Sequence, residues 1–355
     1  MGNRPQFVKA AAVSARLRER DTEVLVHTGQ HYDDELSDVF FRELGLPRPD
    51  RELGIGGGSN TEQTARQLAA LGPVVAEVAP DAVLVYGDTN STLAGGLAGA
   101  QAGIPVAHVE AGMRSFDRTM PEELNRVLTD HLSALLLCPS AAAVANLARE
   151  GVAGRVLEVG DVMVDVAQAA QPRARERTEV LAAHGAAAGE YVLATAHRAG
   201  TVDDPGRLAA LVAVLEAVPA PVLLPLHPRT RSRLEAAGLL ERLTGAGGVR
   251  ILPPLGYLDF TALLCHARAV LTDSGGVQKE AYLAGVPCVT LRTSTEWVET
   301  VTTGWNVLVG LDAEAAASAI LRPAPDARPA LYGDGRAGER VVAALRGGAD
   351  GGGDP

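Results

Sequence analysis

The residues of this chain that could do chemistry gather where apolar segments end, and the segment 271–281 shows this pattern most clearly. Its sequence, LTDSGGVQKEA, combines an apolar run, a turn of Ser274, Gly275 and Gly276, and a helical pattern. Glycines let a backbone approach a ligand closely, and the N–H groups and positive dipole at a helix N-terminus attract phosphate. Glu280 follows about one turn later, where a carboxylate can accept hydrogen bonds from ribose hydroxyls. The segment therefore predicts a site for a nucleotide diphosphate, with a tight turn that binds nothing as the alternative.

Acidic residues follow several other apolar segments. Asp88 comes after AVLVYG, Glu110 comes after PVAHV, and Glu122 with Glu123 come after a proline at the expected start of a helix. Ligands of open α/β sheets bind at the carboxyl ends of the strands, so we expect these carboxylates to share one crevice. Such clusters shift one another's pKa and make proton transfer available. The local alternatives are that Asp88 caps a helix over 89–102 and that either glutamate complements a helix dipole.

Cationic and imidazole side chains occupy similar positions. Arg4 and Lys9 flank the first turn of the chain, His197 with its neighbouring arginine ends YVLATA, and His227 ends PVLLPL. A histidine beside an arginine can neutralise a diphosphate and can protonate or support a leaving phosphate oxygen. Surface histidines at strand ends are the alternative. His108 lies inside an apolar run, so we expect a hydrogen-bonded histidine of the core.

Composition limits the class of protein. The chain has 355 residues, of which 47% are hydrophobic and 21% charged, which predicts large cores and two domains. The net charge of −11 and the pI of about 5.3 argue against nucleic acid or an anionic membrane as a partner. Cys138, Cys265 and Cys288 lie in apolar segments without metal-binding spacing, which favours reduced core residues. No signal peptide or apolar run of about 18 residues is present, so we expect a cytoplasmic protein.

Short apolar runs alternate with helical patterns along the chain. The expected strands are 23–28, 82–86, 105–109, 134–138 and 155–159 in the first half, and 191–196, 221–226, 249–252, 268–272 and 286–291 in the second. Nearly all their residues are apolar, as in parallel strands that are covered on both faces. A helix is expected over 61–79, with Asn60 as its N-cap. The fold class is α/β, with two doubly wound Rossmann-like domains that face each other across a cleft.

The expected domains are 1–170 and 171–334. A helix at about 335–347 is expected to pack back on the first domain, and the Gly-rich tail 348–355 is expected to be disordered. The sequence GNRP at 2–5 looks like a loop after a first strand, although only Met1 precedes it. Because a doubly wound sheet places its first strand in the middle, we expect a translation start placed too late or a truncated chain.

Several segments together resemble the non-hydrolysing UDP-N-acetylglucosamine 2-epimerase family. The resemblance extends from residue 2 to about 310, and it rests on GNRPQFVK (2–9), TGQHYDDELSDVFF (28–41), VYGDTNSTLAG (85–95), HVEAGMRSFDRTMPEELNRVLTDH (108–131), HRAGTVDDP (197–205), PLHPRTR (225–231), LTDSGGVQKEA (271–281) and TEWVE (295–299). It implies a GT-B-like architecture, a homodimer, and inversion of C2 of a UDP-sugar without a metal or nicotinamide cofactor. The implied reaction is loss of the C2 proton and of UDP to give a 2-acetamidoglucal, followed by re-addition at the opposite face.

The resemblance also implies roles for individual residues. It places Asp88, Glu110 and Glu122 around the sugar, with the catalytic base among them. The residues implied near the diphosphate and ribose are Arg4, Lys9, His197, Ser274, Gly275, Gly276 and Glu280. Some bacterial relatives are activated by a second UDP-N-acetylglucosamine molecule, and the matching positions here are Gln30, His31, Arg66 and His227.

The chain departs from the family pattern after His197. Most relatives have HRxEN there, whereas this chain has HRAGT, so a Glu-Asn pair that would orient the histidine is missing. The TEWVE form, with Trp297, is closer to the branch of UDP-2,3-diacetamido-2,3-dideoxyglucuronate 2-epimerases. Such a substrate would need a cation for its C6 carboxylate, for which Arg114, Arg118 and Arg292 are the candidates. Further alternatives are a hydrolysing 2-epimerase and a GT-B glycosyltransferase.

Overall fold

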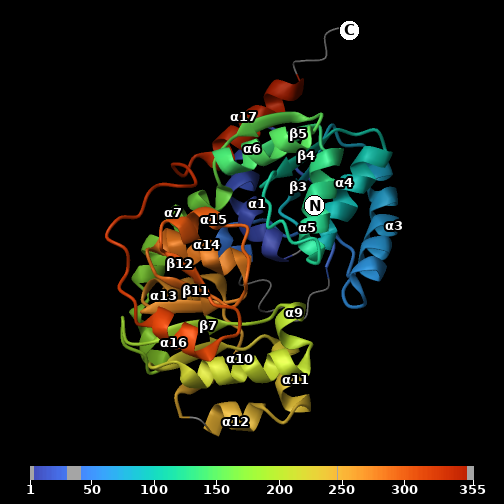
Figure 1. The fold of residues 1–355 in the computed structure, drawn as a ribbon. Coiled ribbons are helices and arrows are strands. Elements are labelled where there is room, and N and C mark those ends of the chain that lie inside the picture. Colours follow the sequence, from blue (N-terminus) through green and yellow to red (C-terminus); the bar gives the residue numbers. More distant parts are fainter. Residues whose placement is uncertain (1–3, 30–40, 246, 350–355) are drawn as a thin grey trace. The chain divides into compact units, whose positions relative to one another are not determined.

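The computed structural model describes residues 4–29, 41–245 and 247–349, and it divides the chain into two compact units (Figure 1). Unit 1 comprises Met1–Gln168 and Ala330–Pro355, and unit 2 comprises Ala169–Pro329. Among the described residues, none of the helices has both the length and the apolar character needed to cross a membrane.

Unit 2 is built on a parallel six-stranded sheet of order β12-β11-β10-β7-β8-β9. The strand order reverses between β7 and β10, which is the kind of position where open α/β sheets bind ligands. The strands are β7 (Val192–Thr195), β8 (Val222–Pro225), β9 (Val249–Leu252), β10 (Ala269–Thr272), β11 (Cys288–Thr290) and β12 (Asn306–Leu308). The helices are α8 (Thr178–Ala183), α9 (Ala199–Val202), α10 (Pro205–Ala217), α11 (Pro228–Ala236), α12 (Leu240–Gly245), α13 (Tyr257–Cys265), α14 (Gly275–Ala284), α15 (Val298–Thr302) and α16 (Ala313–Ile320).

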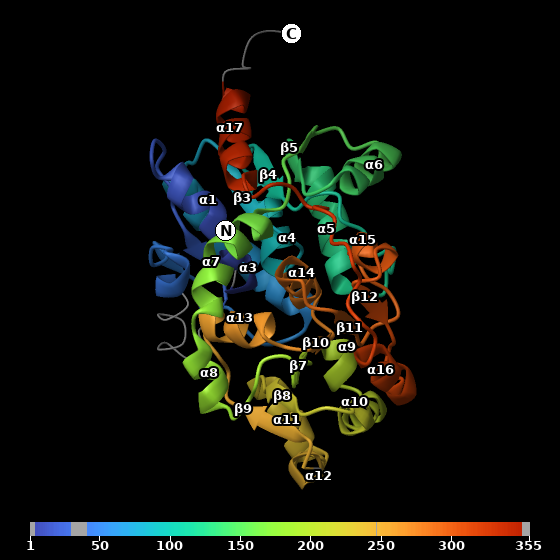
Figure 2. The same cartoon turned by 90° about the vertical axis from the view of Figure 1, so that its left-hand side faces the viewer.

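Helices cover both faces of the unit 2 sheet, and alternate strand residues supply the two cores. Ala194 packs in one cluster with Leu208 of α10 and Ala316 of α16. Leu193 packs in the other with Val180 of α8 and Leu263 of α13. Figure 2 shows α10 beside α16 and α8 beside α13. Burial on both faces explains why these strands are almost wholly apolar in sequence.

The strand pairs of unit 1 form a parallel four-stranded sheet, β3-β4-β5-β6, and a parallel pair, β1-β2. The strands are β1 (Val26–His27), β2 (Arg51–Glu52), β3 (Val83–Tyr86), β4 (Val106–Val109), β5 (Leu135–Cys138) and β6 (Arg155–Glu158). The helices are α1 (Arg4–Leu17), α3 (Asn60–Val78), α4 (Asn90–Gln101), α5 (Pro121–Leu132), α6 (Ala141–Glu150) and α17 (Ala337–Ala349), with α7 (Val162–Arg175) running from unit 1 into unit 2. Helix α4 packs between α3 and α5, and α17 packs on α1 (Figure 1).

The expected α/β class is confirmed, and most predicted strands are present within a residue or two at each end. The run at 23–28 is mostly irregular, since only Val26 and His27 pair as a strand. The short strands β2 and β12 were not predicted. Cys138, Cys265 and Cys288 are buried free thiols, as expected.

Three local predictions were wrong. The N-cap of α3 is Ser59, not Asn60, because Ser59 and Glu62 form a capping box in which each side chain binds the other's backbone N–H. The residues Arg4 and Pro5 open α1 and do not form a turn, since proline is well tolerated in a first helical turn. Helix α17 extends to Ala349, beyond the predicted start of the tail. The expectation of a strand before residue 2 stays a prediction.

Candidate active site

Glu110 follows the carboxyl end of β4 in unit 1, and the residue is 8% exposed. Its backbone has φ 72°, in the left-handed region that non-glycine residues rarely adopt. Such a conformation costs about 1–3 kcal/mol, so the surrounding structure must hold it, and strained residues of this kind cluster at functional sites. The Nζ atom of Lys9, from α1, donates a hydrogen bond to the Glu110 carboxylate. A partly buried cation therefore accompanies this acid.

Gly87 makes room for that ion pair and brings the next acid close. It has φ 63°, and a Cβ atom there would lie 2.7 Å from Lys9 Nζ and 3.2 Å from Glu110 Oε2. The Gly87 N–H also donates to the carbonyl of Val109 at 3.0 Å, which continues the pairing of β3 with β4. Asp88 follows immediately, so the structure places Asp88 and Glu110 at the same edge of the sheet.

Asp88 is bound by helix α5. The guanidinium of Arg126 donates to the Asp88 carboxylate, and the Asn125 amide donates to the Asp88 carbonyl at 3.0 Å. The side chain of Asp88 remains 30% exposed, whereas that of Arg126 is 2% exposed. Glu122 is half-buried and lies four residues before Arg126, so the two share one face of α5. The three sugar-side carboxylates expected from sequence therefore come from neighbouring elements of unit 1.

Asp88 does not cap α4, because Thr89 occupies the N-cap position and its backbone N–H donates to Thr92 Oγ1 at 3.1 Å. The helix start is satisfied without the Asp88 carboxylate, which leaves that carboxylate available to Arg126. This removes the local alternative for Asp88.

A buried hydrogen-bond network of His108, Asp130 and Arg114 supports the ends of β3 and β4. His108 Nε2 lies 2.7 Å from the Gly87 carbonyl and Nδ1 lies 2.7 Å from Asp130 Oδ1, so His108 is the hydrogen-bonded core histidine that the sequence predicts. Asp130 Oδ2 accepts from the Gly112 N–H and from Arg114. Burial raises the pKa of Asp130, but the charges and hydrogen bonds of His108 and Arg114 outweigh it and hold the pKa below its usual range. The network fixes the backbone on which Asp88 and Glu110 stand.

In unit 2, Asp273 at the end of β10 holds the turn that carries His197. Its buried carboxylate accepts from the backbone N–H groups of His197, at 3.1 and 3.2 Å, and of Arg198, at 3.0 Å. His197 itself is exposed and its ring centroid lies 5.9 Å from that of His227. His227 Nδ1 accepts from the Arg229 N–H at 3.2 Å and so caps α11. The Asp273 carboxylate thus fixes the backbone at His197 from the neighbouring strand.

Ser274 precedes α14, whereas Gly275 and Gly276, which the sequence assigns to a turn before the helix, form its first two residues. Ser274 is the N-cap residue, with φ −84° and ψ 127°, and no side-chain hydrogen bond caps the helix. The first N–H groups of a helix have no partner inside it, so the start of α14 offers backbone donors to an anion. A Cβ atom at Gly275 would overlap the Glu296 carboxylate, so a residue larger than glycine does not fit there.

The motifs LTDSGGVQKEA and TEWVE meet in space. Thr295 Oγ1 donates to Gln278 Oε1 at 2.7 Å, and Lys279 Nζ lies 4.0 Å from the centroid of the Trp297 ring. Glu296, which packs on Gly275, pairs with Arg292 at 3.0 Å. This buried packing holds α14, and with it Ser274 at the N-terminus of the helix, in a defined orientation.

Glu280 lies on α14 beside Tyr257 of α13. Burial raises the pKa of Glu280 to about 7, although the charge of Lys279 and a hydrogen bond with Tyr257 act in the opposite direction. An acid whose pKa lies near neutrality and whose partner is a phenol can exchange that partner for the hydroxyl groups of a ligand.

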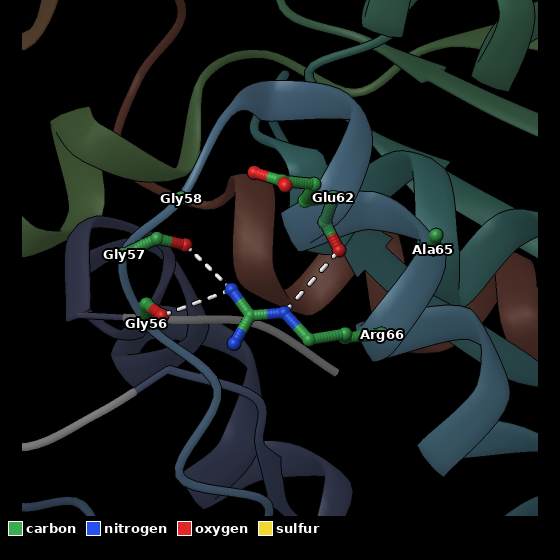
Figure 3. A pocket seen from close by; sticks show the side chains of 6 residues that line it. All are labelled: Gly56, Gly57, Gly58, Glu62, Ala65 and Arg66. Carbon is green, nitrogen blue, oxygen red and sulfur yellow. Dashed lines mark hydrogen bonds between the residues drawn. The ribbon is translucent and has the colours of Figure 1, made fainter.

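A pocket of about 530 Å³ in unit 1 is lined by Gly56, Gly57, Gly58, Glu62, Ala65 and Arg66. Figure 3 shows the Arg66 guanidinium turned toward the glycine loop, where it donates to the carbonyls of Gly56 at 3.1 Å and Gly57 at 2.6 Å. Of the four positions that the family resemblance implies for a regulatory site, Arg66 lies in the described part of unit 1. Gln30 and His31 lie outside the described residues, and His227 belongs to unit 2. Of Arg4, the structure gives the position at the start of α1.

Sequence reasoning missed four residues that organise these sites: Arg126, Asp130, Asp273 and Tyr257. Each acts on a residue distant in sequence, so no local pattern marks it. The spacing of Glu122 and Arg126 could have indicated a shared helix face. The pairing of Arg126 with Asp88, which follows β3, could not have been foreseen without the tertiary structure.

Comparison with known proteins agrees with this architecture. The family model described as UDP-N-acetylglucosamine 2-epimerase matches residues 15–346. A protein of Methanococcus maripaludis named UDP-N-acetylglucosamine 2-epimerase homolog is 44% identical, over 98% of each chain. The UDP-2,3-diacetamido-2,3-dideoxy-D-glucuronate 2-epimerase of Pseudomonas aeruginosa is 46% identical, over 96% of this chain and 97% of that protein.

A solved structure is also similar over nearly the whole chain. The UDP-GlcNAc 2-epimerase of Methanocaldococcus jannaschii, crystallised in complex with UDP-GlcNAc and UDP, superposes with a TM-score of 0.91. It is 40% identical in sequence and is matched over 97% of this chain and 98% of that one. The chain therefore belongs to the non-hydrolysing UDP-N-acetylglucosamine 2-epimerase family, and it is an isomerase that epimerises a UDP-2-acetamido sugar at C2.

Proposed function

We propose that the substrate is UDP-N-acetylglucosamine and the product UDP-N-acetylmannosamine. The observation that carries the proposal is the gathering of Asp88 and Glu110 at one edge of the unit 1 sheet, each bound to a cation, next to the helix that carries Glu122. Acid–base chemistry at two faces of a carbon needs more than one carboxyl group with a defined charge. The structure of the M. jannaschii enzyme with UDP-GlcNAc and UDP supports the same substrate.

The reaction would proceed by elimination and re-addition. A carboxylate of unit 1 takes the C2 proton, the electron pair of that C–H bond forms a C1–C2 double bond, and the C1–O bond breaks so that UDP leaves. UDP then re-adds at C1 while a carboxylic acid delivers a proton to the other face of C2. The C2 proton is only weakly acidic, so the base must be positioned and the leaving diphosphate must be stabilised.

Each group has a task in this scheme. Asp88, Glu110 and Glu122 act on the sugar, and Lys9 orients the Glu110 carboxylate. In unit 2 the backbone N–H groups after Ser274 bind the diphosphate. Glu280 accepts hydrogen bonds from the ribose hydroxyls. His197 stabilises the negative charge that develops on the departing phosphate oxygen. Arg4, at the start of α1, belongs to the same cationic set.

The state of the candidate cations favours a neutral sugar over a glucuronate. Arg114 binds Asp130 at 2.7 Å and Glu150 at 2.6 and 2.7 Å, and it is buried. Arg292 pairs with Glu296. Both would have to leave protein carboxylates to bind a C6 carboxylate, at a cost in paired charge. Arg118 is exposed and stays the strongest candidate for that role.

UDP-2,3-diacetamido-2,3-dideoxyglucuronate is the second candidate substrate. The observation that favours it is the 46% identity to the P. aeruginosa enzyme named for that sugar. Both substrates carry a 2-acetamido group and need the same elimination. The two are therefore distinguished by how the enzyme binds the substituent at C6. Comparing kcat/KM for the two UDP-sugars separates the proposals, and a preference of more than about tenfold for the glucuronate, equal to about 1.4 kcal/mol, would replace the first with the second.

The reaction type is tested in deuterated water with UDP-N-acetylglucosamine. We expect a mixed pool of gluco and manno UDP-sugars with deuterium at C2. Release of free N-acetylmannosamine and UDP would indicate a hydrolysing enzyme. Sugar transfer to an added acceptor without deuterium at C2 would indicate a glycosyltransferase.

We also propose that the pocket beside Arg66 is a regulatory subsite for a second UDP-sugar. Its support is that Arg66, one of the positions that the family resemblance implies for a regulatory site, holds the glycine loop that lines this pocket. Arg66→Ala should then change the dependence of rate on substrate concentration while leaving the maximal rate close to wild type. Superimposable rate curves for the two proteins would exclude the subsite.

A further inference from the structure

Glu123 is a buried carboxylate of unit 1 that accepts hydrogen bonds at both of its oxygen atoms. It follows Glu122 in the first turn of α5 and is 2% exposed. Its Oε2 atom accepts from the Ser115 N–H and hydroxyl, both at 2.9 Å, and from Arg126 Nη1 at 3.1 Å. Its Oε1 atom accepts from the Phe116 N–H at 3.0 Å. Burying a carboxylate is costly unless such hydrogen bonds compensate it, so this arrangement demands a specific benefit.

Arg126 connects Glu123 to Asp88. One terminal nitrogen of the guanidinium binds Glu123 and the other binds the Asp88 carboxylate. The guanidinium is planar and its donors have fixed relative directions, so its hold on Glu123 determines where the nitrogen facing Asp88 points. The side chains of both Arg126 and Glu123 are 2% exposed, which leaves little freedom for rearrangement. Of these three linked side chains, Asp88, which is 30% exposed, is the one that a ligand can reach.

The same carboxylate holds the loop between Glu110 and α5. Phe116 has φ 58°, a left-handed conformation for a bulky residue, and its side chain is 68% exposed. Two successive backbone N–H groups that point at one carboxylate maintain this turn. Strain of this kind persists only where surrounding contacts enforce it, and it concentrates at ligand-binding sites. Glu123 therefore joins the loop after Glu110 to the helix that binds Asp88.

We propose that Glu123 is a positioning residue for the epimerisation, which fixes Arg126 on Asp88 and holds the Ser115–Phe116 turn beside the carboxylate cluster. The inference rests on the proposed function, in which Asp88 acts on the sugar. Complementing the dipole of α5 would explain an acid at this position but would require neither the buried arginine nor the two loop N–H groups. Those contacts distinguish a positioning role from helix stabilisation.

The test is Glu123→Gln, which keeps the size of the side chain but turns an NH2 group toward donors. We expect kcat to fall by about 10²-fold because the reacting groups are misaligned, while the KM for the UDP-sugar and the Kd for UDP stay within about threefold. The matched control is Glu150→Gln, which removes the carboxylate bound to Arg114, and its kcat should stay within about threefold of wild type. Thermal unfolding of both variants reports their stability.

A double mutant separates the failure of this inference from failure of the proposed function. Since Glu123 acts through Asp88, Asp88→Asn/Glu123→Gln should be no slower than Asp88→Asn alone, within about threefold. If Asp88→Asn is inactive and Glu123→Gln turns over like wild type, the positioning role is wrong and the proposed function stands. If Asp88→Asn keeps its turnover, the proposed role of Asp88 is wrong.

A second variant covers the case in which Glu123→Gln does not fold. Arg126→Lys keeps the positive charge, but one ammonium group cannot reproduce the two directed contacts of the fork. We expect the same fall in kcat with KM little changed. A folded Arg126→Lys protein with wild-type kcat would overturn the inference.

Discussion

Unit 1 and unit 2 hold their polar site residues by different means. In unit 1, Glu110 is bound by Lys9 and Asp88 is bound by Arg126, so each of these two acids has a side-chain cation. In unit 2, Asp273 is bound by two backbone N–H groups, and the turn at Ser274 is tied by its own N–H to Thr272 Oγ1 at 3.0 Å. The first arrangement orients side chains, whereas the second sets the path of the backbone.

The difference matches two kinds of chemistry. Groups that exchange protons with a carbon need fixed positions, which ion pairs with nearby cations provide. A diphosphate needs N–H donors in a fixed geometry, which a rigid turn at a helix start provides without titration. Glu280 is the exception in unit 2, since its partner is the hydroxyl of Tyr257 and burial raises its pKa to about 7.

The largest effect is expected for the acids of unit 1. Glu110→Gln removes the carboxylate that Lys9 holds, and turnover should fall by about 10³-fold or more, as for loss of a positioned acid or base. UDP binding should stay within about threefold because the proposed UDP contacts, apart from Arg4, lie in unit 2. Steady-state kinetics and calorimetric titration with UDP measure the two effects. A variant that loses UDP affinity and turnover to the same extent would place Glu110 at the nucleotide.

In unit 2, loss of the backbone anchor should affect stability first. Asp273→Asn leaves the His197 and Arg198 N–H groups facing an amide that can accept fewer hydrogen bonds, and we expect the free energy of unfolding to fall by about 2 kcal/mol. Chemical denaturation of wild type and variant measures this loss. The control is Asp203→Asn, whose carboxylate pairs with Arg229 and Arg233 at an exposed site and should cost less than about 1 kcal/mol. Equal losses for the two variants would show that the Asp273 anchor adds nothing beyond a surface ion pair.

Most of this framework could be predicted from sequence because buried parallel strands are apolar throughout, and ligand groups follow their carboxyl ends. The strands β2 and β12 escaped because they are two and three residues long and include Arg51, Glu52 and Asn306. The cap of α3 was misplaced by one residue, although the spacing of Ser59 and Glu62 is a capping-box signature.

The partners of the site residues could not be predicted. Arg126 lies 38 positions from Asp88, Lys9 lies 101 from Glu110, and Asp273 lies 76 from His197. Such pairs exist only after the sheets have formed, and the strands themselves do not specify which side chain arrives opposite which. The raised pKa of Glu280 has the same origin, because it results from burial by residues of another helix.

Glu280 predicts a pH dependence of nucleotide binding. Its pKa of about 7 lies above the usual 4.5, so the side chain is protonated below about pH 7 and ionised above it. Since an ionised carboxylate is the better acceptor for ribose hydroxyls, UDP affinity should rise as pH increases through 7. Glu280→Gln should bind UDP about tenfold more weakly at pH 8 and lose this dependence. The same pH slope in wild type and variant would assign the titration to UDP itself.

The same shift has a consequence for stability. Because the folded protein binds this proton more tightly than the unfolded chain, the contribution of Glu280 is fully present below about pH 4.5 and is lost as pH rises through about 7. The difference in the free energy of unfolding between wild type and Glu280→Gln should therefore change in this window. A difference that is constant from pH 4.5 to 8 would contradict the raised pKa.

The smallest effect is expected for Tyr257→Phe, which removes the hydroxyl that lowers the pKa of Glu280 while leaving the ring in place. The midpoint of the pH dependence of UDP binding should move to higher pH, and affinity well above that midpoint should stay close to wild type. Calorimetric titrations across the pH range, with Tyr282→Phe on the opposite side of α14 as the matched control, measure the shift. The Tyr282 hydroxyl donates to the Pro329 carbonyl and has no part in ribose binding, so that variant should keep the wild-type midpoint. A midpoint that moves to lower pH in Tyr257→Phe would mean that the phenol favours the protonated acid, and Glu280 would then meet the ribose as a hydrogen-bond donor.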